Sequence, residues 1–386
     1  MMTSTIRIGT ASPASGPSRS ATLSRLSSLA RCAASKKIDI LLLPEAFIGG
    51  YPRGTSFGCV MGERTAEGRD EFARYFDEAV DLGDVVGEAG GGGGLRWVRR
   101  ELGARGREEA EERGDGTREV LEGVAKDTGV FIVTGIIEKA GGSLYCAVVY
   151  VCPQEGIIGK RRKVMPTGSE RLIWAQGAPS TLAAVSTTIR GTRINMAAAI
   201  CWENYMPLLR ASLYAQNINL YLAPTADGRD AWLSLLRTIG IEGRCFVASS
   251  NMCVRAGGET GRRSHEIAPA PGTSRRRMSV MDEDGNEIIL PCTESTPTTQ
   301  QWGQHEAKAP HARTDFVSRG GSCIVSPFGQ VLAGPQWEDD QSLVYADVDM
   351  RDCIRGRLDL DTAGSYSRGD SFRLTVQGLE LDPLPY

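Results

Sequence analysis

Short apolar runs rich in β-branched residues recur along the chain and predict a series of buried β-strands. They lie at residues 6–11, 38–46, 130–138, 144–151, 194–202, 218–224, 245–254, 322–329 and 342–349. Between several of them the apolar spacing changes to that of a helix. In residues 20–37, five apolar side chains fall three and four positions apart, at Leu23, Leu26, Leu29, Ala30 and Ala33.

Residues 117–129 and 231–244 show the same helical spacing. The alternation of strands and helices indicates an α/β fold, and the pattern by itself predicts one doubly wound sheet. Two segments interrupt it, a glycine-rich and densely charged stretch at 87–116 and a polar, proline-rich stretch at 255–315. Such stretches bury too little apolar area to offset their ordering entropy. We therefore predict one domain over residues 1–386 with two surface insertions.

Composition narrows the range of partners. The 386 residues are 41% hydrophobic and 24% charged, which is close to the globular average, and the formal net charge is -3. This balance favours neither nucleic acid nor an anionic membrane as partner, so we interpret the basic clusters of the second insertion as solvated loops. The chain shows neither an apolar secretory segment nor a run of about 18 apolar residues. We expect a soluble, cytoplasmic protein.

The chain has ten cysteines but no Cys-x-x-Cys pair, so we expect reduced thiols, no metal site and no cofactor. Most of these cysteines are best interpreted as small buried apolar residues. Cys201 stands out because it ends an apolar run where a helix is about to begin. All three histidines, His265, His305 and His311, fall in the second predicted insertion. A nucleophilic Cys201 would therefore need a base other than histidine.

A buried carboxylate can serve as that base when burial raises its pKa toward neutrality. Glu45 is the candidate, because LLLPEAFIGGYPRG (41–54) places it at the end of an apolar strand, where sites form in α/β folds. On this stretch alone, a surface glutamate that ends the strand is the commoner interpretation. GKRRKVMPTGSERLIW (159–174) adds four cations within four residues. We expect most of them to be solvated, with one lysine turned inward to hold Cys201 as thiolate.

LLLPEAFIGGYPRG, RKVMPTGSERLIW and CWENYMPLLR closely resemble, in order, three signatures of the nitrilase branch of the carbon-nitrogen hydrolases. The resemblance implies a four-layer αββα sandwich in place of the doubly wound sheet. Carried onto matching positions, it implies a catalytic triad of Glu45, Lys163 and Cys201. It also implies that Glu170 lies beside the triad, that Tyr51 and Trp202 line the substrate pocket, and that the Trp202 amide stabilises developing charge.

The implied activity is hydrolysis of an organic nitrile to its carboxylic acid and ammonia through a Cys201 thioimidate and thioester. The partner would be a small nitrile, with no cofactor. The alternatives are hydration of cyanide to formamide, amide hydrolysis, and a non-catalytic scaffold whose insertions close the site. We expect Lys163 and the following helix, with Pro207 near its start, to lower the Cys201 pKa.

The chain departs from the common family pattern at several positions outside the triad. Arg161, Thr238 and Ser365 stand where many members carry histidine, and Gly369 stands where they carry proline. These departures weaken any inference about a particular substrate. Only 16 residues follow Asp370, so we expect a homodimer or small homo-oligomer rather than the long spirals of members with longer tails.

Overall fold

The predicted strands assemble into two mixed sheets in this computed structural model, which describes residues 5–83, 114–256, 279–281, 287–289 and 316–386. The first sheet has the spatial order β17 (Leu343–Asp349), β1 (Thr5–Ala11), β2 (Ile40–Leu42), β5 (Phe131–Ala140), β6 (Ser143–Cys152) and β7 (Gly156–Arg162). The second has the order β12 (Cys253–Arg255), β15 (Phe316–Val325), β11 (Phe246–Asn251), β10 (Leu220–Thr225), β9 (Thr192–Ala198) and β8 (Val185–Ile189), with β16 (Val331–Trp337) beside β15. Two short pairs complete the strands, β3 (Cys59–Val60) with β4 (Glu63–Arg64), and β13 (Ser279–Met281) with β14 (Glu287–Ile289).

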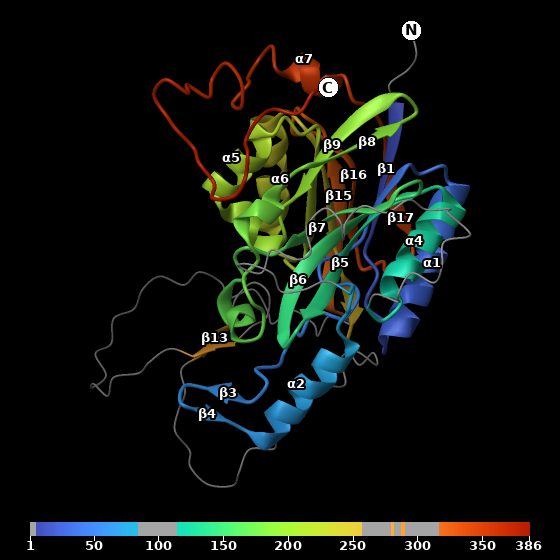
Figure 1. Cartoon of the computed structure of the whole chain (residues 1–386), viewed down its shortest axis with the longest axis vertical. Helices are drawn as coiled ribbons and strands as arrows, with labels where there is room; N and C mark the ends of the chain where they lie inside the picture. Colours follow the sequence, from blue (N-terminus) through green and yellow to red (C-terminus); the bar gives the residue numbers. More distant parts are fainter. Residues whose placement is uncertain (1–4, 84–113, 257–278, 282–286, 290–315) are drawn as a thin grey trace, which may run out of the picture.

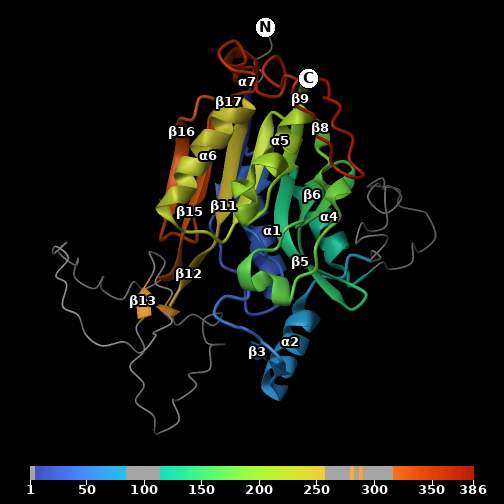
Figure 2. The ribbon, with the colours of Figure 1, turned by 90° about the vertical axis from the view of Figure 1, so that its left-hand side faces the viewer.

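Helices cover the outer face of each sheet, as Figures 1 and 2 show. Helices α1 (Arg19–Ser35) and α4 (Thr117–Thr128) lie on the first sheet, and α5 (Pro207–Ala215) and α6 (Asp230–Gly243) lie on the second. The remaining helices are α2 (Ala66–Glu78), α7 (Asp352–Gly356) and the 3₁₀ turns η2 (Gly168–Leu172), η3 (Pro179–Leu182) and η4 (Cys201–Tyr205). The three helices predicted from spacing are confirmed as α1, α4 and α6, within two residues at each end.

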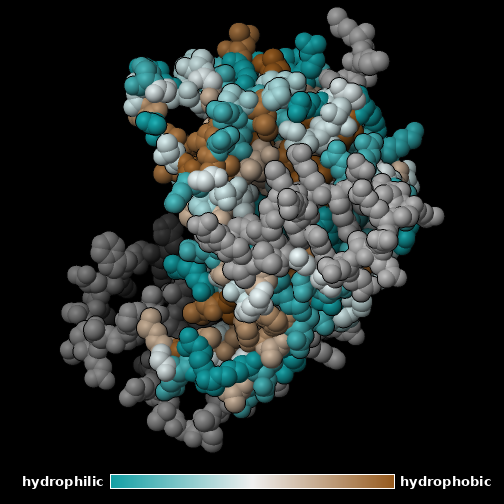
Figure 3. Space-filling view, in the orientation of Figure 1, coloured by the Kyte–Doolittle hydropathy of each residue, from teal (hydrophilic) through white to brown (hydrophobic). Residues whose placement is uncertain are grey.

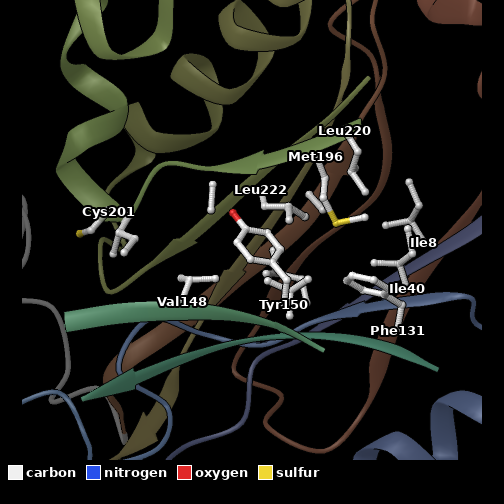
Figure 4. Close-up of a cluster of buried hydrophobic side chains, with 14 of the residues drawn as sticks. Ile8, Ile40, Phe131, Val148, Tyr150, Met196, Cys201, Leu220 and Leu222 are labelled. Atoms are coloured by element: carbon white, nitrogen blue, oxygen red, sulfur yellow. The ribbon is translucent and has the colours of Figure 1, made fainter. Parts of the chain in front are cut away.

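Three apolar layers hold the four structural layers together. Leu26 and Leu121 belong to the layer between the first sheet and its helices, and Leu213 belongs to the corresponding layer of the second sheet. The central layer lies between the two sheets, where Val148 of β6 faces Leu222 of β10 (Figure 4). This is the αββα sandwich that the resemblance implied.

The doubly wound sheet predicted from the apolar pattern is wrong. Only β1, β2 and β5, and β9, β10 and β11, run parallel, whereas β6, β7, β8, β15 and β16 pair antiparallel with their neighbours. A strand buried on both faces has the same apolar pattern whether a helix or a second sheet covers it. The pattern therefore could not distinguish one doubly wound sheet from two facing sheets.

Helix α2 and the β3–β4 pair extend from one end of the sandwich, and apolar side chains gather above α2 in the space-filling view (Figure 3). Phe57 packs against Phe72 and Tyr75 of α2. Most of the two predicted insertions lies outside the described residues, so they and the single domain over 1–386 stay predictions. Among the helices of the described part, none is long and apolar enough to cross a membrane.

Candidate active site

Glu45 lies where the chain leaves β2, and its side chain is fully buried. The Gly135 N–H of β5 donates to the Pro44 carbonyl. A Cβ at Gly135 would lie 2.3 Å from that carbonyl oxygen and 2.6 Å from the Ala46 nitrogen, so only glycine lets the two segments approach this closely. Because the Glu45 residue is 0% exposed, the alternative of a surface glutamate is wrong.

Lys163 follows β7 directly and brings its ammonium group to two carboxylates. Its Nζ lies 2.8 Å from Glu45 Oε1 and 2.8 Å from Glu170 Oε2, and its side chain is fully buried. The Trp174 ring lies beside the ammonium at 5.5 Å. A cation held between two anions at this depth is a fixed charge rather than a mobile surface group.

Glu170 is oriented by the turn that carries it. The Thr167 N–H and hydroxyl both donate to Glu170 Oε2 at the start of η2. The Tyr51 hydroxyl donates to the other oxygen, Oε1, at 2.9 Å. Tyr51 thus reaches the site through Glu170.

Cys201 begins η4 at the end of the apolar layer between the sheets (Figure 4), and the residue is 4% exposed. Its φ of +53° lies in the left-handed region, which costs a non-glycine residue about 1–3 kcal/mol. The Asn204 side-chain amide donates to the carbonyls of Ala199 and Cys201, at 2.8 and 2.7 Å. These two hydrogen bonds hold the strained turn that presents the thiol.

Two contacts of the site were missed by sequence reasoning. The Thr225 hydroxyl, at the end of β10, donates to Cys201 Sγ at 3.3 Å, and the Cys146 thiol of β6 donates to Glu45 Oε1 at 3.6 Å. Thr225 ends an apolar strand parallel to the strand before Cys201. That position, equivalent to that of Glu45 in its own sheet, was a signal that could have identified it. Cys146 lies inside an apolar run and gave no such signal.

Burial controls the protonation of Glu45, Lys163 and Cys201, the three residues of the predicted triad. It raises the pKa of Glu45, helped by the negative charge of Glu170 and opposed by Lys163. Burial alone would lower the Lys163 pKa, but Glu45 and Cys201 raise it well above its usual value. Burial, together with Glu45, also raises the Cys201 pKa. The expectation of a resting thiolate is therefore wrong, because Lys163 does not outweigh the desolvation of the sulfur.

The four cations of residues 160–163 contradict the expectation that most are solvated. Their side chains are at most 4% exposed, and each has a carboxylate partner. Glu138 pairs with Lys160 and Arg162, Glu203 pairs with Arg161, and Glu45 and Glu170 pair with Lys163. Partners distant in sequence make the burial of all four charges possible.

Tyr51 and Trp202, both predicted to line the substrate pocket, line two different cavities. The cavity at Tyr51 has about 30 Å³, which suits one or two water molecules. The cavity at Trp202 has about 320 Å³ and is lined by Thr167, Trp202, Tyr205, Met206, Arg229 and Ala231. Only the second is in the size range of small-molecule sites.

The wall of the larger cavity is held by Asp227, which sequence reasoning also missed. Trp202 is 41% exposed, and its indole N–H donates to Asp227 Oδ2 at 3.0 Å. Arg229 pairs with the same carboxylate and stacks over the indole, with its guanidinium carbon 4.5 Å from the ring centroid. These contacts hold Trp202 and Arg229 as an aromatic and cationic wall, and Trp202 directly follows Cys201 in the sequence.

The assembled site combines a buried thiol, a carboxylate of raised pKa and a protonated lysine. Such a set can form a covalent bond to an electrophilic carbon, move protons and stabilise developing negative charge without histidine. The three histidines lie outside the described residues. All nine cysteines of the described part are free thiols.

Comparison with known proteins identifies the family of the chain. The carbon-nitrogen hydrolase family model matches residues 7–357. An arylacetonitrilase from Trametes versicolor is 35% identical over 364 residues, which cover 92% of this chain and 91% of that protein. A bifunctional nitrilase/nitrile hydratase from Lupinus angustifolius is 35% identical over 367 residues, covering 95% and 84%.

The fold also has solved counterparts. Nit3 of Saccharomyces cerevisiae, a member of branch 10 of the nitrilase superfamily, superposes with a TM-score of 0.56 at 14% identity. The match covers 94% of this chain and 96% of that one, and at this identity it shows the fold alone. With the family model spanning nearly the whole chain, this protein belongs to the carbon-nitrogen hydrolase family of enzymes.

Proposed function

We propose that this protein is a nitrilase that hydrolyses an organic nitrile to its carboxylic acid and ammonia, with Glu45, Lys163 and Cys201 as the catalytic triad. The observation that carries the proposal is the Lys163 ammonium, which lies 2.8 Å from both Glu45 and Glu170. The nitrilase relatives, at 35% identity, support nitriles as the substrate class.

In the proposed reaction, Glu45 accepts the Cys201 proton as the sulfur attacks the nitrile carbon. One π bond of the nitrile breaks, a C–S bond forms, and the proton passes to the nitrogen to give a thioimidate. The raised pKa of Cys201 means that this proton leaves during attack rather than before it. Lys163 stabilises the negative charge that develops on nitrogen, and the Trp202 amide is the proposed second donor.

Glu45 then activates water, which adds to the thioimidate carbon. Expulsion of ammonia leaves a thioester, and a second water releases the carboxylic acid and restores the thiol. If the first tetrahedral intermediate expels the Cys201 sulfur instead, the product is the amide. The bifunctional nitrilase/nitrile hydratase among the relatives supports this branch as a minor outcome.

The cavity beside Trp202 favours an organic nitrile over cyanide. Its volume of about 320 Å³ far exceeds what a two-atom anion fills. We assign this cavity to the group attached to the nitrile carbon.

The test is a panel of an aliphatic nitrile, benzonitrile, phenylacetonitrile and cyanide, with both ammonia and amide quantified. We expect ammonia from at least one organic nitrile and a loss of at least about 1,000-fold in Cys201→Ala. Cys323→Ala is the matched control, since Cys323 is also buried but lies in the layer under α6. Formamide from cyanide with no ammonia would replace the proposal with cyanide hydration.

The scaffold alternative has its own measurement. Iodoacetamide labelling with peptide mass spectrometry should show substrate-protectable alkylation of Cys201. Failure of Cys201 to react in the folded protein, together with silence on the whole panel, would favour a closed and non-catalytic site.

A further inference from the structure

Glu203, two residues after Cys201, is a fully buried carboxylate with four hydrogen-bond or ion-pair donors around it. Its Oε1 accepts the N–H groups of Val164 and Met165 at 2.7 and 3.2 Å. Its Oε2 accepts the Ile200 N–H at 2.8 Å and lies 2.6 Å from Arg161 Nη2.

These donors come from both sides of the proposed triad. Val164 and Met165 are the two residues that follow Lys163, and Ile200 immediately precedes Cys201. Lys163 belongs to the edge of the first sheet and Cys201 to the end of a strand of the second. The Glu203 side chain therefore ties the backbone that carries the cation to the backbone that carries the nucleophile.

The chemistry of the four donors requires a carboxylate. Both oxygens face only donors, so each must act purely as an acceptor. A glutamine of the same length would turn its NH₂ group toward either the Val164 and Met165 amides or the Ile200 amide and Arg161. The NH₂ group would then face donors and lose the hydrogen bonds on that side of residue 203, whereas the amide oxygen would keep those on the other side.

We propose that Glu203 is a positioning residue that sets the separation between Lys163 Nζ and Cys201 Sγ and supports the left-handed backbone of Cys201. The inference rests on the proposed function only in its kinetic readout. Neither reacting atom touches Glu203, so its effect passes through the backbone of Ile200 and Val164. A misplacement near 1 Å at such a pair lowers catalysis by about 100-fold.

The first experiment is Glu203→Gln, with steady-state kinetics and the iodoacetamide rate of Cys201 measured on the folded protein. We expect kcat to fall about 30- to 100-fold with KM changed by less than about threefold. The rate of Cys201 alkylation should change by at least about threefold, since the thiol has moved relative to Glu45 and Lys163. Unchanged kcat and unchanged alkylation would overturn the proposal.

A second variant separates positioning from charge balance. Arg161→Met combined with Glu203→Gln removes the buried cation that the first change leaves without its partner. We expect the double variant to regain thermal stability while kcat stays low. Recovery of kcat to near the wild-type value would show that Glu203 only neutralises Arg161.

Glu122→Gln is the matched control. Glu122 is also a buried carboxylate that accepts an arginine, Arg118, and a backbone N–H, Ile157, at 3.0 and 3.1 Å, but it belongs to α4, the helix on the outer face of the first sheet. We expect it to lower Tm with little change in kcat or in Cys201 alkylation. If kcat of Glu122→Gln falls as much as that of Glu203→Gln, a general loss of stability would explain both results and the positioning role would fail.

The alkylation arm distinguishes failure of this inference from failure of the proposed function. If the wild-type protein hydrolyses no nitrile, a change in Cys201 reactivity specific to Glu203→Gln still supports positioning. If nitrile hydrolysis is normal in wild type and in Glu203→Gln, the proposed function stands and the positioning role fails.

Discussion

Two buried ion clusters take their cations from the same run, residues 160–163, but the hydrogen bonding of their carboxylates differs. Around Glu138, Oε2 accepts Arg162 Nε, and Oε1 accepts both Lys160 and Arg162. Around Glu45, Oε1 accepts Lys163 and the Cys146 thiol, whereas Oε2 has no hydrogen-bond partner among the described residues.

This difference separates a structural charge cluster from one fit for chemistry. A carboxylate whose two oxygens both accept hydrogen bonds from cations is a poor proton acceptor, because the cations stabilise its ionised form. The buried Oε2 atom of Glu45, which no cation contacts in the described part of the chain, can accept a proton, and a buried oxygen of this kind in a native structure calls for a functional explanation. Burial and ion pairing are common to both clusters, so the unsatisfied oxygen is the feature that distinguishes them.

The largest effect is expected when each of the two carboxylates is replaced by an amide. Glu45→Gln should lower kcat by about 1,000-fold or more, because it removes the proton acceptor. Glu138→Gln should instead lower the free energy of unfolding by about 3–5 kcal/mol, because Lys160 and Arg162 lose a buried partner. Nitrile turnover and denaturant unfolding of both variants give the comparison. A larger loss of kcat in folded Glu138→Gln than in Glu45→Gln would break it.

The pH dependence of kcat/KM tests whether Glu45 accepts the proton. Glu45 must be ionised to accept a proton, and its pKa is raised, so activity should fall as pH drops through a midpoint above the usual glutamate range. The raised pKa values of Lys163 and Cys201 predict no matching loss between neutral pH and about pH 9.

Removal of the Glu170 charge should shift this profile in a known direction. Because Glu170 raises the Glu45 pKa, the residual activity of Glu170→Gln should show its acid midpoint at lower pH than wild type. A midpoint that stays in place, or moves upward, would assign the acid limb to another group.

A smaller effect should come from the donor on the sulfur. Thr225→Val keeps the side-chain shape but removes the hydroxyl that lies 3.3 Å from Cys201 Sγ. One hydrogen bond of about 1 kcal/mol corresponds to a five- to tenfold lower kcat. Thr134→Val, a buried threonine of β5, is the control and should leave kcat near wild type. Equal losses in the two variants would remove Thr225 from the site.

The smallest effect should come from Tyr51, whose hydroxyl contacts the proposed triad through Glu170. Tyr51→Phe removes the 2.9 Å hydrogen bond to Glu170 Oε1 and should lower kcat about two- to fivefold. A loss as large as that of Glu45→Gln, measured on the same nitrile, would instead place Tyr51 in direct contact with the reaction.

The sequence by itself predicted three of the described helices, most strands and, through three local motifs, the residues that gather at the site. Helical spacing is a local property, so α1, α4 and α6 could be found within two residues at each end. Glu45 and Thr225 both end apolar strands, and a strand end is also readable without a structure.

Only the tertiary structure decided what depends on partners distant in the chain. An apolar strand does not reveal whether a helix or a sheet covers it, so the pattern predicted one sheet where two face each other. The sequence of the run at 160–163 predicts solvated cations, but in the structure Glu138 and Glu203, which lie on other elements, pair with three of them in the interior. The Cys201 pKa likewise follows from desolvation, which no neighbour in sequence imposes. Local motifs can be recognised in the sequence, whereas burial and charge pairing depend on residues that only the tertiary structure brings together.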